Sequence, residues 1–533
     1  MKRSPLADIR DILDFKFNAI LIFYLLLGSI LIYFYRYQIS PDSISYISLT
    51  QKYLRGDFAN AINGCWAPLY SWLLIPLLAV GFEPLLASVI LTVFFGMLIL
   101  MATRLLSRRF SFPENISTVI LIALVPAILS YALNDSPPDF FVILFLLLYF
   151  NVIFDKDYTG KKLNGILCGV YASLAYFSKA YALPFFILHF LLFNIIHYHK
   201  ASTGLNKKNV LRNCVYGFLV FFFINGPWIA LISVKYDRVT FSTAGKFNYL
   251  ASGPESKSKG GPYYYEGLFP PTNETAVSAW EDPTYHQMPE WSPLESWSLF
   301  KYQLKLIVRN SKKNLQKFQS FSSLSRYILF FYFLMALVPL RKLISKDIIL
   351  YPLLTLILYC SGYIVMVVES RYLWVNAVLL ILMGGHLIRL LLRSGHFNKL
   401  SQSLLILFFA ATFVLPASKY LRANVNTKKD VYQLGKKLEK DYGIHGNIAA
   451  NKHYTTMYIA YHIGAQYFGQ VKPNQTAEEI ENELNTYDID YYFVWQDSNE
   501  HPAFLSAFPE VTNGNIPGLR IYALKDHVSS SSF

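Results

Sequence analysis

The sequence predicts a polytopic α-helical membrane protein, and its composition, its apolar stretches and its charge pattern all support this fold class. Of its 533 residues, 54% are hydrophobic and only 15% are charged, whereas soluble domains carry closer to ~25% charged residues. Apolar stretches of roughly 20 residues, the length that crosses a bilayer, recur along the chain. Breaks separate about eleven such stretches, which begin near Phe17, Pro84, Ile116, Asp139, Leu163, Ala182, Leu211, Tyr327, Asp347, Tyr372 and Gln402.

The basic residues predict which helix ends face the cytoplasm. The formal net charge of +14 would suggest a nucleic-acid partner in a soluble protein. Here Lys and Arg gather in alternate loops, as they do on the cytoplasmic side of membrane proteins, so no nucleic acid is expected. With a cytoplasmic N-terminus, the basic inner loops contain Arg108-Arg109, Lys161-Lys162, Lys207-Lys208, Arg341-Lys342 and Arg393. We therefore expect a multi-pass protein of the cell inner (plasma) membrane.

The same alternation places two long loops, 38–83 and 235–325, on the side facing the periplasm or exterior. The short apolar stretch 68–82 of the first loop predicts a re-entrant or surface-lying helix, with a full crossing as the alternative. In the second loop, residues 294–318 have helical periodicity with many Lys and Arg on the polar side, which predicts a helix lying on the membrane surface. Loops this long usually work as lids or binding elements.

After the last span the composition becomes that of a soluble domain. We divide the chain into a transmembrane domain of residues 1–417 and a small extracytoplasmic α/β domain of residues 418–533, a normal size for a domain. Thr476 and Glu479 form a capping box that predicts a helix start. The other expected elements are helices over 428–442 and 454–468 and strands over 446–451, 489–495 and 519–524.

Three acids on outer turns are candidates for chemistry. Asp42 follows Ser40 and Pro41 just beyond the first span, where a carboxylate meets water, headgroups and a lipid-linked substrate at once. It also suits a helix start, with Ser40 as cap and Pro41 at the first position. Asp135 and Asp139 lie on the next outer turn. One acid can act as general base while another orients it, or the latter two can be a turn residue and a helix cap.

Two outer cations are candidates for binding an anion. Lys179 interrupts an apolar stretch, and Arg371 follows Glu369 between two late spans. Cations near membrane depth are costly unless they are paired or functional, and the positive-inside bias does not explain them on this side. A lipid phosphate would explain both. The alternatives are a salt bridge to Glu369 for Arg371 and snorkelling to the headgroups for Lys179.

Other motifs are missing from the sequence. It contains no P-loop, no Gly-rich dinucleotide fingerprint, no H-E-x-x-H and no G-x-S-x-G element. The four cysteines are scattered and show neither metal-ligand spacing nor a disulfide framework. No metal site is therefore predicted from spacing.

The order of these elements resembles the GT-C glycosyltransferases, the superfamily that includes protein O-mannosyltransferases and the lipid A aminoarabinose transferase (glycosyltransferase family 39-like). The resemblance covers Phe17 to about Leu415. The matching pieces are Asp42 with Tyr46, the Trp66-Ala67-Pro68-Leu69-Tyr70 segment, the acid after the third span, Ser178-Lys179 and Glu369-Ser370-Arg371-Tyr372. One departure is that the first loop lacks the second acid, followed by a basic residue, of the aminoarabinose enzyme.

The resemblance implies an inverting glycosyltransferase that takes sugar from a polyprenyl-phosphate carrier at the outer face of the bilayer. Asp42 would be the catalytic base, with Asp139 or Asp135 as its partner acid. Lys179 and Arg371 would stabilise the leaving phosphate, and the matched residues beside them, Tyr46, Glu369 and Tyr372, would contact substrate. The acceptor would be a lipid, glycan or protein. Some distant members use a divalent cation, which the acids here do not compel.

Two other classes fit part of the pattern. A transporter or flippase for lipid-linked glycans would place ionisable residues near mid-membrane and often has internal repeats, and we find no repeat. A polymerase or ligase for such glycans would also have outer arginines, but would not need an acid just past the first helix.

Overall fold

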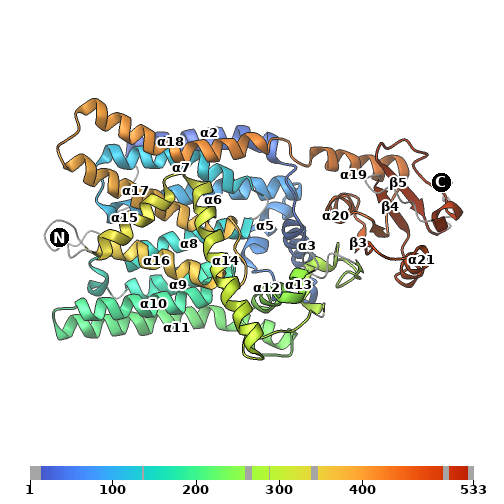
Figure 1. Cartoon of the computed structure of the whole chain (residues 1–533), viewed down its shortest axis with the longest axis horizontal. Helices are drawn as coiled ribbons and strands as arrows, with labels where there is room; N and C mark the ends of the chain where they lie inside the picture. Colours follow the sequence, from blue (N-terminus) through green and yellow to red (C-terminus); the bar gives the residue numbers. More distant parts are fainter. Residues whose placement is uncertain are drawn as a thin grey trace.

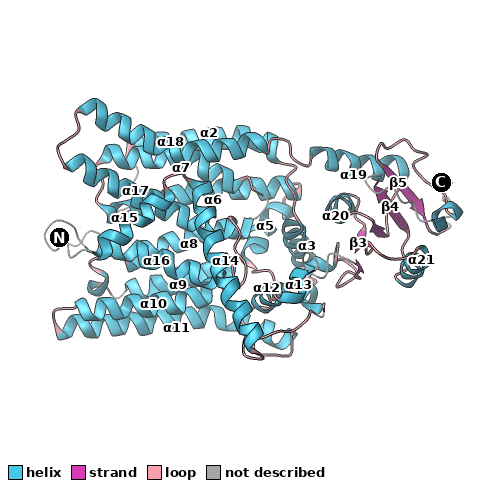
Figure 2. Cartoon of the chain, in the orientation of Figure 1, coloured by secondary structure: helices cyan, strands magenta, loops and turns pink. Residues whose placement is uncertain are grey.

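The computed structural model describes residues 14–134, 137–161, 163–258, 267–286, 288–337, 346–495 and 503–525. It is mostly helical, and the long helices lie side by side in one bundle (Figure 1). The strands gather in a separate lobe at one end of the bundle, next to the C-terminus (Figure 2).

Among the described residues, eight helices are long and apolar enough to cross a membrane, or up to nine when one bent pair counts as a single span. The eight contain α2 (Phe15–Tyr35), α6 (Pro84–Ser107), α7 (Glu114–Ala132), α10 (Ala182–Lys200), α11 (Gly204–Lys235), α16 (Lys346–Ile364), α17 (Trp374–Arg393) and α18 (Lys399–Ala423). The bent pair is α14 (Trp297–Phe321) and α15 (Ser325–Leu337), which meet at 114°. Shorter apolar helices are α5 (Leu69–Ala79), α8 (Pro137–Ile153) and α9 (Leu163–Ser178). The count of eleven spans stays a prediction.

Helix α3 (Pro41–Arg55) begins as its sequence predicts. Ser40 is the N-cap, its side chain accepts from the Ser43 amide, and Ser43 accepts in return from the Ser40 amide, so a capping box closes the first turn. Pro41 occupies the first helical position, and Gly56 ends the helix at φ 75°. The short helices α4 (Phe58–Ala61) and α5 follow. This local chemistry fixes Asp42 in the first turn of α3.

The lobe near the C-terminus contains a five-stranded sheet of order β1-β3-β2-β4-β5. Its parallel pairs are β2 with β3 and β2 with β4, and its antiparallel pairs are β1 with β3 and β4 with β5. The elements are β1 (Gly267–Leu268), α19 (Lys429–Tyr442), β2 (Asn447–Ala450), α20 (His453–His462), β3 (Gln466–Gln470), α21 (Ala477–Thr486), β4 (Tyr491–Trp495) and β5 (Leu519–Ala523). The Thr476–Glu479 capping box is present at the start of α21.

One expectation for this region needs correction. The helix predicted over 454–468 stops at His462, because Gly464 takes a left-handed conformation at φ 66° and the chain then extends into β3. Helix α18 continues to Ala423, and the division of the chain into two domains stays a prediction. The sheet also has a member from outside the predicted domain, because β1 comes from the long outer loop.

The long outer loop folds over the bundle end and is attached to the sheet. It contains α12 (Ala244–Ala251), α13 (Pro254–Ser258), β1, and the 3-10 turns η4 (Ala279–Glu281) and η5 (Pro283–Tyr285). The Tyr467 amide donates to the Val277 carbonyl at 2.7 Å, and the Gln466 side-chain amide donates to the Asn273 and Ala276 carbonyls, both at 3.1 Å. The segment that leads into η4 is therefore held against β3.

A buried ion pair fixes η4 onto α3. Lys52 Nζ lies 2.5 Å from Glu281 Oε1, and the two side chains are only 2% and 3% exposed. The Ser48 hydroxyl donates to the other Glu281 oxygen at 2.5 Å, and Asn273 adds a bond of 3.1 Å. Buried charges are tolerated when they are paired and hydrogen-bonded, so this network holds the loop in a defined place beside α3.

Replacing Lys52 with methionine should destabilise the protein strongly, because Glu281 is then a buried charge without its cation. We expect Lys52→Met to lower the free energy of unfolding by about 3–5 kcal/mol, measured by denaturant titration in mixed micelles. The double variant Lys52→Met/Glu281→Met should recover most of this loss, because an apolar pair replaces the ionic one. A loss below about 1 kcal/mol, typical of an exposed pair, would contradict the assignment.

Candidate active site

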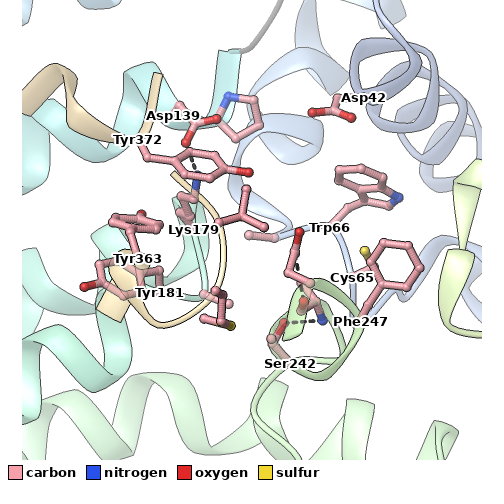
Figure 3. Close-up of a pocket in the computed structure, with 18 of the residues that line it drawn as sticks. Asp42, Cys65, Trp66, Asp139, Lys179, Tyr181, Ser242, Phe247, Tyr363 and Tyr372 are labelled. Atoms are coloured by element: carbon pink, nitrogen blue, oxygen red, sulfur yellow. Dashed lines mark hydrogen bonds and ion pairs between the residues drawn. The ribbon is translucent and has the colours of Figure 1, made fainter. Parts of the chain in front are cut away.

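Six of the predicted site residues line one cavity of about 250 Å³. They are Asp42, Tyr46, Asp139, Lys179, Arg371 and Tyr372. Figure 3 shows Asp139, Lys179 and Tyr372 together on one side of this cavity, with Asp42 and Trp66 opposite. The cavity lies at the end of the bundle that carries the outer loop.

The four charged residues come from four segments that are far apart in the sequence. Asp42 lies in the first turn of α3 and Asp139 in the first turn of α8. Lys179 follows directly after α9, and Arg371 begins the 3-10 turn η6 (Arg371–Leu373) before α17. Each of them therefore lies at a helix end, where the bundle opens toward the outer loop.

These charges form one connected network. The Arg371 guanidinium donates to Asp42 Oδ2 at 2.6 Å, and its Nε lies 3.5 Å from Asp139 Oδ2. Lys179 forms an ion pair with the other oxygen of Asp139. Arg371 thus bridges the two carboxylates, as the planar fork of a guanidinium allows. Two carboxylates and two cations share a site in which each side chain is between 7% and 28% exposed.

Aromatic rings complete the walls of the cavity. Lys179 Nζ lies 3.7 Å from the centre of the Tyr372 ring, which is a cation–π contact. Burial lowers the pKa of the Lys179 ammonium group, and the Asp139 carboxylate opposes this shift. The Asp139 carboxylate therefore favours the charged form of the Lys179 amine.

Tyr46 is buried and packs edge-on against Trp66 at 5.3 Å.

Trp280 is a site residue that sequence reasoning missed. Its indole N–H donates to Asp42 Oδ1 at 3.0 Å, so Trp280 and Arg371 each contact one oxygen of this carboxylate. Trp280 belongs to η4, next to Glu281 of the buried ion pair. The only signal in the sequence was an aromatic-rich outer loop, which does not indicate which Trp faces Asp42.

The structure does not bring every predicted residue into the cavity. Glu369 lies outside its lining and faces α14, 3.4 Å from Lys313 and 3.7 Å from Lys317. Asp135 lies outside the described residues. Arg371 binds Asp42, so the predicted salt bridge to Glu369 is not the one that forms.

The acids of the cavity do not fit a divalent cation. Within the described part of the chain, no group of three or more His, Cys, Asp or Glu side chains could hold a metal ion. Asp42 already binds Arg371, and Asp139 binds Lys179. We therefore derive no step through a metal.

An apolar groove of about 540 Å³ adjoins the cavity. The two share several lining residues, namely Tyr181, Pro184, Phe241, Ser242, Gly245 and Met366. Beyond these, the groove is lined by side chains such as Phe185, Leu188 and Leu358 from α10 and α16. The charged cavity and the apolar groove are therefore neighbours that share part of their walls.

Comparisons with known proteins identify the fold. No family model and no curated protein matches the sequence. The crystal structure of ArnT from Cupriavidus metallidurans bound to undecaprenyl phosphate matches with a TM-score of 0.55 at 10% identity, over 95% of this chain and 98% of that chain. The archaeal oligosaccharyltransferase AglB from Archaeoglobus fulgidus, in complex with an inhibitory peptide and a dolichol-phosphate, has a TM-score of 0.47 at 10% identity, over 90% and 69%. The first match carries the assignment: the chain shares the fold of ArnT from Cupriavidus metallidurans, in agreement with the fold that the sequence resemblance implies.

Proposed function

We propose that this protein is an inverting glycosyltransferase that moves a sugar from a polyprenyl-phosphate carrier to an acceptor hydroxyl at the outer face of the membrane. The observation that carries the proposal is the meeting of Asp42, Asp139, Lys179 and Arg371 in one cavity that adjoins an apolar groove. The acceptor is a lipid, a glycan or a protein. The inner (plasma) membrane and a periplasmic or exterior active site belong to the same proposal.

In this mechanism Asp42 is the general base. Its carboxylate takes the proton of the acceptor hydroxyl, whose oxygen attacks the anomeric carbon of the donor sugar. The bond between this carbon and the phosphate oxygen breaks, and the electron pair leaves with the lipid phosphate. Inversion follows because the acceptor attacks from the face opposite the phosphate. Trp280 and Arg371 hold Asp42 for this step by their hydrogen bonds to its two oxygens.

Lys179 and Arg371 would stabilise the leaving phosphate. Charged donors aimed at the position where negative charge develops are worth several kcal/mol in a site with little water. Asp139 would keep Lys179 charged and in place through their ion pair. The rings of Tyr46 and Tyr372 in the cavity wall support a role in substrate contact.

The apolar groove supports a lipid-linked donor. A polyprenyl chain needs an apolar surface, while its phosphate needs cations, and the groove and the cavity offer these side by side. The fold match to a structure that holds undecaprenyl phosphate supports the same donor class. A transporter or a polymerase for lipid-linked glycans is the alternative, and release of polyprenyl phosphate in the assay below separates sugar transfer from transport.

Asp42→Asn should abolish most of the sugar transfer while leaving donor binding nearly unchanged. Loss of a general base lowers kcat by roughly 10²–10⁴-fold. The assay gives the purified protein a polyprenyl-phosphate sugar and a membrane extract as acceptor, and follows released polyprenyl phosphate by mass spectrometry.

Asp441→Asn is the matched control, because this exposed acid at the end of α19 undergoes the same chemical change. It should retain the wild-type rate. Transfer by Asp42→Asn near the wild-type rate would show that Asp42 is not the base. A wild-type protein that moves lipid-linked glycan across vesicles without releasing polyprenyl phosphate would favour the transporter.

Arg371→Ala should weaken donor binding more than Arg371→Lys does. Alanine removes the charge and both carboxylate contacts, whereas lysine keeps a charge but cannot bridge Asp42 and Asp139 in the same way. We expect the donor Kd to rise by roughly 10- to 100-fold for alanine, the value of a charge-assisted hydrogen bond. The measurement is binding of a non-transferable polyprenyl-phosphate analogue to detergent-purified protein. An unchanged Kd in a folded Arg371→Ala variant would exclude Arg371 from the phosphate site.

Trp280→Phe tests the positioning of Asp42. The substitution keeps an aromatic ring but removes the N–H that donates to Asp42 Oδ1. We expect kcat to fall by roughly 10-fold, as for one hydrogen bond to a charged group, while the donor KM stays within twofold. A rise in KM with an unchanged kcat would instead place Trp280 in donor binding.

A further inference from the structure

Helix α14 has three distinct faces. Its inward face carries the buried side chains Gln303, Leu306, Asn310, Asn314 and Phe318. A second face carries large apolar side chains that are exposed, with Trp297 at 67%, Leu304 at 47% and Val308 at 56%. Leu315 and Phe300 continue this stripe at helical spacing. An exposed apolar stripe on one helix marks a surface that has a partner.

The third face is basic. Helix α14 contains six cations and no acid, and the cations are Lys301, Lys305, Arg309, Lys312, Lys313 and Lys317. Lys313 and Lys317 lie near Glu369. The structure gives no ion pair for Lys305, Arg309 or Lys312 within the residues it describes, and these three side chains are exposed. The basic face therefore complements an anionic partner.

The placement of α14 points to the bilayer as that partner. Helix α14 runs across the bundle helices and then bends by 114° into α15, which returns along the bundle (Figure 1). A helix that crosses membrane-spanning helices in this way lies in the plane of the bilayer. Apolar side chains on one face and Lys and Arg on another are the pattern of a helix at the boundary between headgroups and acyl chains.

We propose that α14 binds the anionic headgroups of outer-leaflet phospholipids and, through its inward face, makes the position of Arg371 depend on that binding. Asn310 donates to the Ile364 and Met366 carbonyls at 3.0 and 2.9 Å, and Gln303 donates to the Val365 carbonyl at 3.0 Å. These carbonyls belong to residues 364–366, which lie just before Arg371 in the sequence. The second part of the proposal rests on the proposed function, whereas the lipid binding does not.

The first experiment tests contact with the bilayer. The protein is placed in nanodiscs of phosphatidylglycerol with or without brominated acyl chains, and the emission of wild type minus that of Trp297→Phe isolates Trp297. Most of this difference should be lost in brominated lipid. Trp291→Phe is the control, because Trp291 is buried against Tyr249, and the corresponding difference should be unaffected by bromine. A Trp297 signal that bromine leaves unchanged would overturn the interfacial placement.

The second experiment tests the headgroup preference. Native mass spectrometry counts phosphatidylglycerol and phosphatidylcholine bound from an equal mixture. In the triple variant K305Q/R309Q/K312Q, the ratio of bound phosphatidylglycerol to bound phosphatidylcholine should fall roughly fivefold for each cation removed. The control K436Q/K437Q/K440Q removes the same charge from α19 and should keep the preference. An unchanged preference for phosphatidylglycerol in the α14 variant would overturn the proposal.

The third experiment tests the link to Arg371. Wild-type donor Kd should be lower in phosphatidylglycerol nanodiscs than in phosphatidylcholine nanodiscs by roughly 5- to 150-fold, the usual range of coupling between sites. Asn310→Ala should remove this difference but keep the lipid preference. Equal Kd values in wild type would overturn the coupling. Absence of sugar transfer in every lipid would overturn the proposed function, while the first two experiments still decide the lipid site.

Discussion

The bridge that Arg371 forms between Asp42 and Asp139 is the interaction on which the rest of the structure depends. It joins the first outer loop, the start of α8 and the segment before α17. A guanidinium at this depth is costly without partners, and neither carboxylate is favourable there alone. The bundle therefore brings these segments together in one arrangement, and Lys179 completes it by binding Asp139.

Near this bridge, the long loop is fixed by polar contacts to α3 and to β3. The Lys52–Glu281 pair fixes η4 on α3, and the neighbouring Trp280 then reaches Asp42. The same loop is hydrogen-bonded to β3 a few residues earlier. The C-terminal lobe is thus connected to the carboxylate through a short stretch of backbone, although none of its described residues lines the cavity.

The sequence allowed the helical class and much of the candidate site to be predicted, because both have local or periodic signals. Ser40, Pro41 and Asp42 indicate a helix start, whereas the side of the membrane expected from Lys and Arg in alternate loops stays a prediction. Trp280, Glu281 and β1 could not be found in this way, since their partners lie far along the chain and leave no spacing to detect. The prediction of a single helix over 454–468 was wrong, because the apolar pattern continues past Gly464 while the left-handed conformation of that residue ends the helix.

The pairing of β1 with β3 has a consequence for biosynthesis. Residues 267–268 emerge from the ribosome long before residues 466–470, which are their partners in the sheet. Chains are made from the N-terminus, so β1 has no partner until residues 466–470 have been made. The strand pair closes only then. The five-stranded sheet is therefore completed near the end of synthesis, when a strand from the middle of the chain pairs with one made much later.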